Sequence, residues 1–224
     1  MTLRDPVAEI ASHLSPRDHS ERLALYVAMG DSFTAGTGAD EDASWPDLLT
    51  DALRPAHPAI ELRNLAVEGA TSDQVVEQLP EAIELEPDLV TVVCGANDVL
   101  LCTRPDPERY AANLALILGR LLVSVPGVRV ATATSPERWD FMPLGPRTRR
   151  RIERGISECN SITRSLAGTL GVPCLEVAGH PGLSRSENFS DDGLHPSPRG
   201  HTRAAEGFAA LLRERHGIDT EEAA

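Results

Sequence analysis

A serine stands between an aspartate and an aromatic residue at the end of an apolar run, in the stretch VAMGDSFTAGTG at residues 27–38. The hydroxyl of Ser32 is a weak nucleophile at its own pKa and needs a general base within hydrogen-bond reach. His195 is the candidate base, because the unperturbed pKa of histidine lies near neutrality. Asp192 precedes His195 by three residues and, by turning back through Gly193, would hold the tautomer whose Nε2 faces the serine. These residues predict a Ser-His-Asp triad.

A serine that attacks a carbonyl also needs donors for the oxyanion that forms. We expect three donors: the backbone N–H groups of Ser32 and Gly69, and the side-chain amide of Asn97. A glycine at position 69 allows close backbone approach and backbone angles that other residues avoid. The absence of G-x-S-x-G argues against the nucleophile elbow of α/β-hydrolases. The serine is instead expected to open a loop after the first strand.

Five apolar runs rich in β-forming residues must position these groups. They lie at residues 23–30, 60–67, 88–95, 128–135 and 173–179. Helix-length amphipathic segments between them predict an α/β fold, a three-layer α/β/α sandwich with a five-stranded parallel sheet of the flavodoxin-like, doubly wound type. In such a sheet ligands bind beyond the carboxyl ends of the strands. Ser32, Gly69 and Asn97 follow the first three runs, so all three should meet at that edge.

The helices between these runs are bounded by their caps and their 3.6-residue period. Ser44 precedes one helix as its N-cap. Ser72 precedes another, in which Pro80 is expected to kink or split the helix. Long helices are predicted from Arg147 to Leu170 and from Ser197 to His216.

The length and net charge of the chain limit the number of domains and the class of partner. A chain of 224 residues fits one domain, 1–224, with residues 1–20 and 217–224 as loosely held termini. The net charge of -13 argues against a nucleic-acid or anionic-membrane partner, so we expect a small-molecule partner. All 21 basic residues are arginine, which excludes Schiff-base lysine chemistry and the P-loop. No apolar run suits a signal peptide or a membrane span, which predicts a cytoplasmic protein without a span.

The sequence offers little support for a metal or redox site. No C-x-x-C spacing joins the four cysteines, Cys94, Cys102, Cys159 and Cys174. We expect buried free thiols, although the spacing leaves a bridge between Cys94 and Cys102 open. A hydrolytic metal centre would recruit Asp31, Asp98, Asp192, His195 and His201. Because no H-E-x-x-H or comparable spacing is present, we expect no metal and no organic cofactor, and expect His180 and His201 to be packed or solvated.

Four blocks in order resemble the GDSL-type, or SGNH, hydrolase superfamily. They are GDSF at 30–33, NLAVEGATS at 64–72, GAND at 95–98 and DGLHP at 192–196. Phe33 stands where the nominal first motif has leucine. The later blocks supply Gly69, Asn97 and the Asp192 and His195 pair. The resemblance implies the SGNH hydrolase fold and a serine esterase of the GDSL type.

Three further acidic residues lie beside the candidate triad. In the superfamily the equivalents of Asp31 mostly organise the loop by bonding to backbone amides, so we expect structural roles for Asp31 and Asp98. Asp191 is the residue that competes with Asp192 for the role of orienting His195. Its spacing of four residues from the histidine fits the family pattern less well.

The segment SPERWDFMPLGPRTRRR, residues 135–151, is the best indication of specificity. It places Trp139, Phe141 and Met142 on the catalytic rim, where they either form an apolar wall for an acyl group or pin the loop to the core. Five arginines follow: Arg147, Arg149, Arg150, Arg151 and Arg154. Such a charge run is usually solvated, and binding of an anionic acyl donor by Arg147 and Arg149 is the alternative.

These observations predict a serine hydrolase that cleaves a carboxylic ester through an acyl-serine intermediate. The ester could belong to a lipid, an acetylated sugar, a thioester or a secondary metabolite. An acyltransferase, in which another acceptor replaces water, uses the same acyl-enzyme and stays an alternative. A ligand-binding descendant without catalysis would be expected to lack one of Ser32, Asn97, Asp192 or His195, and all four are present.

Overall fold

A computed structural model describes residues 22–220 of the chain. Five parallel strands form one sheet in the order β2-β1-β3-β4-β5. The strands are β1 (Leu25–Gly30), β2 (Glu61–Asn64), β3 (Leu89–Val93), β4 (Arg129–Ala133) and β5 (Cys174–Leu175). This is the flavodoxin-like, doubly wound order, which confirms the predicted fold class. The expectations of a loosely held N-terminus, of no leader peptide and of a cytoplasmic location rest on residues outside the described part.

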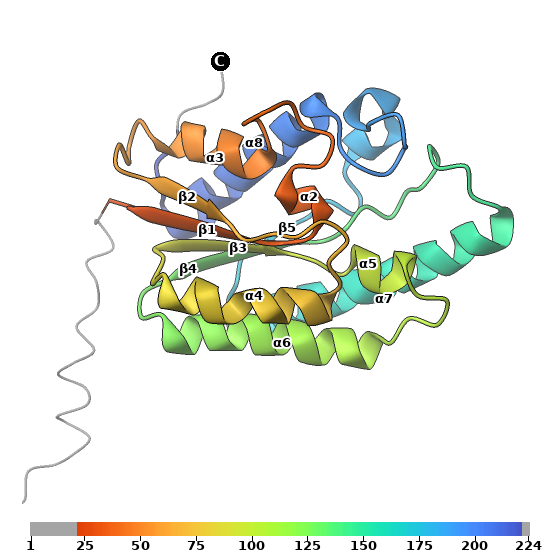
Figure 1. Ribbon diagram of the computed structural model, residues 1–224, viewed down its shortest axis with the longest axis horizontal. Coiled ribbons are helices and arrows are strands. Elements are labelled where there is room, and N and C mark those ends of the chain that lie inside the picture. The colour runs from red at the N-terminus through yellow and green to blue at the C-terminus, as the bar shows by residue number, and fades with distance from the viewer. Residues whose placement is uncertain (1–21, 221–224) are drawn as a thin grey trace, which may run out of the picture.

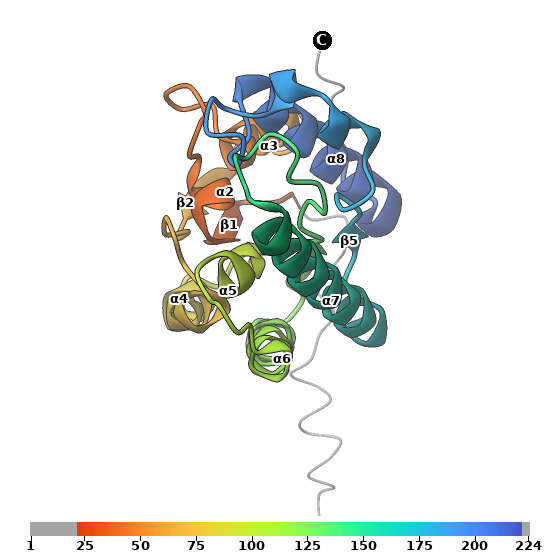
Figure 2. The ribbon, with the colours of Figure 1, turned by 90° about the vertical axis from the view of Figure 1, so that its right-hand side faces the viewer.

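Helices cover both faces of the sheet (Figure 1). One face carries α3 (Trp45–Leu53) and α8 (Pro198–His216), and the other carries α4 (Ser72–Glu84), α6 (Pro107–Ser124) and α7 (Pro146–Leu170). Four short helices were not expected from the sequence: α2 (Ser32–Ala35), α5 (Ala96–Leu100), η1 (Pro181–Ser184) and η2 (Ser186–Asn188). Figure 2 looks onto the edge where the strands end, with α2 and α5 turned toward the viewer.

The sheet is held by two apolar clusters, one on each face. All five residues of β3 are buried, as are the residues from Tyr26 to Gly30 in β1. This burial on both faces explains why these strands read as near-continuous apolar runs. On the face of α3 and α8, the rings of Trp45 and Phe208 stack with their centroids 4.5 Å apart. The edge strand β2 is mostly exposed and carries Glu61 and Arg63, charges that discourage pairing with another chain.

Strand β5 is shorter than the apolar run that predicted it. The side chain of Thr134 takes over where the ladder stops: its Oγ1 accepts hydrogen bonds from the amides of Val177 (2.8 Å) and Ala178 (3.0 Å). These amides therefore bond to a side chain rather than to a neighbouring strand. The chain then leaves the sheet toward η1 and η2, which brings a loop over the catalytic edge.

The helix caps follow the sequence closely. Ser44 forms a capping box with Asp47 at the start of α3. In α4 the N-cap is Thr71, one residue earlier than expected, and it forms a capping box with Gln74. The helix α4 runs unbroken through Pro80, so the expected split does not occur. Pro80 lies on the exposed side of the helix, away from the packed face.

The chain does not become loose at Gly217. Gly217 has a φ of 63° and ends α8 in the left-handed conformation that favours glycine. Ile218 then folds back and is only 4% exposed, within the cluster under α3 and α8. Arg213 donates to the carbonyl of Thr220 at 3.1 Å. Ile218 is thus packed and Thr220 is hydrogen-bonded, whereas Asp219 is exposed.

All four cysteines are free thiols, so the bridge left open between Cys94 and Cys102 is not formed. Cys94 and Cys159 are buried, and burial raises the pKa of Cys159 to about 12. A thiol with a raised pKa is a poor nucleophile. Within residues 22–220, none of the helices has the length and apolar character needed to cross a membrane.

Candidate active site

The nucleophile candidate sits at the junction of β1 and α2. Strand β1 ends at Gly30, Asp31 is the N-cap of α2, and Ser32 is its first residue. A Cβ on Gly30 would lie 2.3 Å from the carbonyl oxygen of Val93, so only glycine fits between the strands. The serine therefore opens a short helix at the carboxyl end of β1, where the sequence had predicted a loop.

A buried glutamine fixes the residue at the end of this strand. The side-chain Oε1 of Gln78 accepts from the amide of Gly30 at 2.9 Å, and its Nε2 donates to the Gly30 carbonyl at 2.8 Å. The side chain of Gln78 thus hydrogen-bonds to both the N–H and the C=O of Gly30. We did not predict this residue. Its sequence signal is a polar residue on the apolar face of α4, beside Val75 and Leu79.

Ser32, His195 and Asp192 are connected by hydrogen bonds. His195 Nε2 lies 2.9 Å from Ser32 Oγ, and His195 Nδ1 lies 2.6 Å from Asp192 Oδ2. The other carboxylate oxygen of Asp192 accepts from the amides of Leu194 (2.8 Å) and His195 (3.0 Å). Burial acts to raise the pKa of Asp192, but the hydrogen bonds from His195 and these amides outweigh it and hold the pKa below its ordinary value.

The loop that carries the histidine turns at Gly193, which has a φ of 67°. A Cβ on Gly193 would lie 2.4 Å from the carbonyl oxygen of Phe141, so the two loops are in direct contact there. The competing carboxylate, Asp191, is exposed and makes no hydrogen bond to any residue between 22 and 220. The geometry therefore pairs His195 with Asp192.

The expected oxyanion donors come from three neighbouring loops. Asn97 is 8% exposed, and its Nδ2 donates to the carbonyl of Ala70 at 3.0 Å, which leaves a second N–H on the same nitrogen. Gly69 lies in a turn in which the amide of Ala70 donates to the carbonyl of Val67. The amide of Val67 in turn donates to the carbonyl of Gly30. These bonds hold the Gly69 loop between the end of β1 and α5.

Gly69 has a φ of 74°, a conformation that favours glycine, while no described atom lies within 4 Å of where its Cβ would be. Within the described chain, the amides of Gly69 and Ser32 donate no hydrogen bond. Both amides are thus available as donors to a ligand.

The two acidic residues beside the triad have different surroundings. Asp98 accepts hydrogen bonds from the amide and hydroxyl of Ser72 at the start of α4. Asp31 is 4% exposed, and its Oδ1 accepts from the amide of Phe33 at 3.0 Å. Burial raises the pKa of Asp31 to about 7, although the Phe33 amide and the nearby His195 oppose the shift. Asp31 thus titrates near neutrality next to the triad.

A cavity of about 170 Å³ opens beside Ser32, His195 and Asn97. Trp139, which is 3% exposed, lines it. The other three candidates from the 135–151 loop are not among its lining residues. Phe141 packs on Phe189 with ring centroids 5.2 Å apart, Met142 packs against the core, and Arg147 is exposed in the first turn of α7.

Two of the five arginines after this loop, Arg149 and Arg151, have structural partners, and the other three are exposed. Arg149 donates to the carbonyls of Trp139 and Met142 and lies 3.6 Å from a carboxylate oxygen of Asp140. Arg151 donates to the carbonyls of Val99 and Cys102. Arg149 thus pins the loop that carries Trp139, and its charge is partly neutralised.

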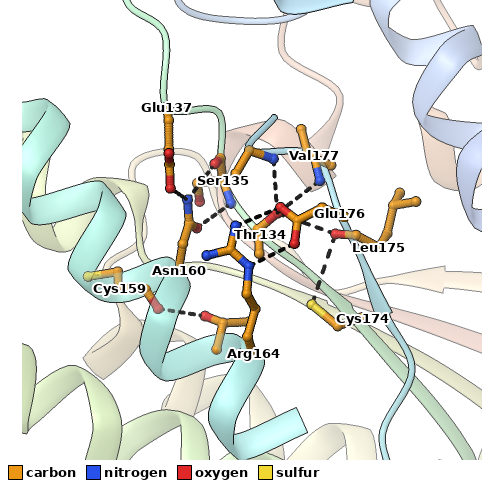
Figure 3. A network of polar contacts seen from close by, with 12 residues as sticks. Thr134, Ser135, Glu137, Cys159, Asn160, Arg164, Cys174, Leu175, Glu176 and Val177 are labelled. Carbon is orange, nitrogen blue, oxygen red and sulfur yellow. Dashed lines mark hydrogen bonds and ion pairs between the residues drawn. The ribbon is translucent and has the colours of Figure 1, made fainter. Parts of the chain in front are cut away.

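A second clamp, also missed from the sequence, holds the end of β4 (Figure 3). Asn160 Oδ1 accepts from the amide of Ser135 at 2.7 Å, and its Nδ2 donates to the Ser135 carbonyl at 2.9 Å. Nearby, Thr134 donates to Glu176, whose carboxylate also binds Arg164 through two contacts of 2.7 Å. Thr134, Ser135 and Glu176 all line the cavity.

The two histidines outside the triad differ in role. His201 is fully buried: its Nδ1 accepts from the amide of Trp45 at 3.1 Å, and its Nε2 lies 3.2 Å from the carbonyl of Thr37. Burial lowers the pKa of His201, which keeps it neutral and packed, as expected. His180 lines the cavity. No group of three or more potential metal-ligating side chains is found between residues 22 and 220.

The fold and the linked hydroxyl, imidazole and carboxylate are those expected of a serine hydrolase of the SGNH type. Residues 28–203 match the GDSL-like Lipase/Acylhydrolase family. The chain therefore belongs to this family, which confirms the resemblance seen in the four sequence blocks. The protein is an enzyme, a GDSL-type hydrolase that acts on esters.

Individual relatives agree with this assignment. An arylesterase of Vibrio mimicus is 27% identical over 194 residues, which cover 86% of this chain and 88% of that protein. Thioesterase 1/protease 1/lysophospholipase L1 of Escherichia coli (strain K12) is 26% identical over 186 residues, 83% of this chain and 81% of that protein. The crystal structure of a lipase/acylhydrolase from Enterococcus faecalis shares the fold, with a TM-score of 0.70 and 23% identity over 91% of this chain and 100% of that chain.

Proposed function

We propose that the protein hydrolyses a carboxylic ester through an acyl-serine intermediate on Ser32. The observation that carries this proposal is the pair of hydrogen bonds through His195, 2.9 Å to Ser32 Oγ and 2.6 Å to Asp192. A hydroxyl bonded to an imidazole that is itself oriented by a carboxylate is the arrangement that activates serine as a nucleophile. The route uses groups of this chain and water.

In this route Ser32 Oγ attacks the ester carbonyl while His195 Nε2 takes its proton. The proton then passes to the departing alkoxide, and the acyl group stays on the serine. Water, deprotonated by His195 Nε2, then attacks the acyl carbonyl; the bond to Ser32 Oγ breaks, His195 returns the proton to Oγ, and the acid leaves. Asp192 keeps the Nδ1 proton in place and stabilises the imidazolium formed in each step.

The oxyanion of each tetrahedral intermediate would be met by the amides of Ser32 and Gly69 and by the side chain of Asn97. The unused amides of Ser32 and Gly69 and the second N–H of Asn97 support this assignment. Such donors act strongly because they are oriented before the charge develops.

The size of the cavity favours a short acyl or an aromatic group. Its volume of about 170 Å³ is close to that of a protein cavity known to bind benzene, ~150 Å³. Of the four candidates in the 135–151 loop, Trp139 is the one that we propose as a substrate contact, because it lines the cavity. The relatives' names, arylesterase and thioesterase, are compatible with aryl esters and acyl thioesters as substrates.

Hydrolysis of p-nitrophenyl esters from acetate to octanoate tests the proposal. The wild type is expected to prefer short acyl chains, and Ser32→Ala should lose at least ~10³-fold in kcat, in line with the loss of a triad member. Ser157→Ala, which removes an exposed hydroxyl on α7, is the matched control and should retain activity. Comparable activity of Ser32→Ala and the wild type would reject the acyl-serine route.

A further inference from the structure

Within residues 22–220, one cationic side chain lines the active-site cavity without a partner. Arg203 of α8 lines the cavity together with Ser32 and His195, and it is half-buried. Its guanidinium makes no hydrogen bond or ion pair with any residue from 22 to 220. The chain carries a net charge of -13, so acidic groups are abundant elsewhere. A partly desolvated guanidinium that is left unpaired in such a chain indicates a place for a ligand anion.

Other arginines near the cavity are already paired. Arg164 forms two contacts of 2.7 Å with Glu176, so this carboxylate at the cavity wall is neutralised (Figure 3). Arg199, one turn before Arg203 on α8, lies 3.4 Å from Glu187. Arg149, an anion-binding candidate from the sequence, bonds instead to carbonyls of its own loop. Arg203 is thus the cavity-lining arginine that keeps its charge available.

A second donor lies next to it. The amide of Gly182 donates to His180 Nδ1 at 3.0 Å, so the proton of the neutral imidazole is on Nε2. A Cβ on Gly182 would lie 2.9 Å from His180 Nδ1 and 3.2 Å from Arg203 Nη1, so both side chains approach the same point. His180, Gly182 and Arg203 all line the cavity. The guanidinium of Arg203 and the imidazole of His180 therefore lie close together on the cavity wall.

Beside the polar residues Thr134, Ser135, Glu176 and Asn188, the rest of the cavity wall is largely apolar. It includes Leu175, Val177, Leu183, Phe189 and Ala204. An acyl group that stays on the serine through two chemical steps is the part of the substrate that such an enclosed wall would hold. A chain of methylene groups suits the apolar wall, and a carboxylate at its far end suits the guanidinium.

We propose that Arg203, assisted by His180, binds a carboxylate at the far end of the acyl group, so that the enzyme prefers monoesters of dicarboxylic acids. This inference rests on the proposed esterase function. Arg203 is a specificity residue in this account and takes no part in bond making or breaking. Its loss should therefore raise KM for anionic esters and leave kcat for neutral esters nearly unchanged.

The test compares two esters of equal acyl length, p-nitrophenyl valerate and the mono-p-nitrophenyl ester of glutaric acid. For the wild type, kcat/KM should be higher with the anionic ester. Arg203→Gln should lower kcat/KM for this ester about tenfold or more and change it about twofold or less for valerate, as expected for loss of a charged hydrogen bond. Arg203→Lys should recover part of the loss. Arg120→Gln, an exposed site on α6, is the matched control.

The inference would be overturned if the ratio of kcat/KM for the anionic ester to kcat/KM for valerate were the same in the wild type and in Arg203→Gln. The same comparison would be made with the succinate and adipate monoesters. Calorimetric titration with glutarate separates it from the proposed function. If neither ester is hydrolysed, the esterase proposal fails. Glutarate binding that is lost in Arg203→Gln would still support the anion site, and absence of glutarate binding to the wild type would reject it.

Discussion

The two ends of the candidate site are built by the same device and serve different purposes. At the end of β1, Gln78 holds both backbone groups of Gly30, two residues before the nucleophile. At the end of β4, Asn160 holds both backbone groups of Ser135, which lines the cavity. In each case one buried carboxamide replaces the neighbouring strand as hydrogen-bond partner. The first clamp positions the chemistry, and the second positions the wall that the substrate contacts.

We expect the two clamped ends to control different kinetic constants. Ser32 and Asn97 belong to the chemical end, which includes the end of β3. Trp139 and Glu176 belong to the cavity end, formed by the loops after β4 and β5. Changes at the chemical end should alter kcat, whereas changes at the cavity end should alter KM and the preferred acyl length.

The largest effect outside the triad is expected at Asn97. Asn97→Ala removes one oxyanion donor and should lower kcat by ~10² to 10³, with little change in KM. Steady-state hydrolysis of p-nitrophenyl butyrate measures both constants. Asn160→Ala is the comparison variant at the cavity end. If Asn97→Ala and Asn160→Ala lowered kcat equally, the claim that the two ends control different kinetic constants would be wrong.

The matched pair Gln78→Leu and Asn160→Leu sharpens the comparison. Gln78→Leu leaves the buried amide of Gly30 without an acceptor, while its carbonyl keeps the Val67 amide, and Asn160→Leu leaves both backbone groups of Ser135 unsatisfied. Each substitution should lower the free energy of unfolding by ~1 to 3 kcal/mol. Gln78→Leu should reduce kcat about tenfold, because Gly30 positions Ser32. Asn160→Leu should keep kcat within about threefold and shift the chain-length profile of p-nitrophenyl esters. Urea unfolding and the ester series test both, and identical kinetic signatures would contradict the account.

A pH-dependent effect on stability, with a small effect on catalysis, is expected from Asp31. Its pKa is raised from 3.8 to about 7, so the folded state keeps this proton to a higher pH than the unfolded chain. The contribution to stability is therefore complete below pH 4 and is lost as the pH rises through 7, by up to about 4 kcal/mol. Asp31→Asn removes this loss and keeps an acceptor for the amide of Phe33.

Urea unfolding of the wild type and Asp31→Asn from pH 5 to pH 8 measures the effect. The difference in the free energy of unfolding should grow with pH in favour of Asp31→Asn. Asp40→Asn, at an exposed aspartate, is the control and should follow the wild type. Parallel curves for Asp31→Asn and the wild type would show that Asp31 does not titrate near neutrality.

The fold and the triad were predictable because apolar runs and caps define each element locally, and because parallel strands bring the residues that follow them to one edge of the sheet. Apolar runs such as that of β3 are buried on both faces, and the Gly-rich blocks directly follow strands. The position of Asp192 three residues before His195 allowed its pairing to be inferred. A short loop of this kind leaves few other partners for the imidazole.

The two clamps and the cavity end were not predictable, because their contacts join residues far apart in the sequence. Gln78 is 48 residues from Gly30, and Asn160 is 25 residues from Ser135. Only the fold brings these side chains to the strand ends. The same reason applies to Arg203, which becomes a cavity residue because the first half of α8 lines the cavity. Phe141 and Met142 looked like cavity residues in the sequence, yet they pack on Phe189 and on the core.

Covalent trapping of the nucleophile tests the central claim most directly. The protein would be treated with a fluorophosphonate, and the adduct would be located by intact mass and peptide mapping. The account predicts one adduct on Ser32, slowed strongly in His195→Ala and absent in Ser32→Ala. An adduct on another residue, or labelling that persists in Ser32→Ala, would contradict it.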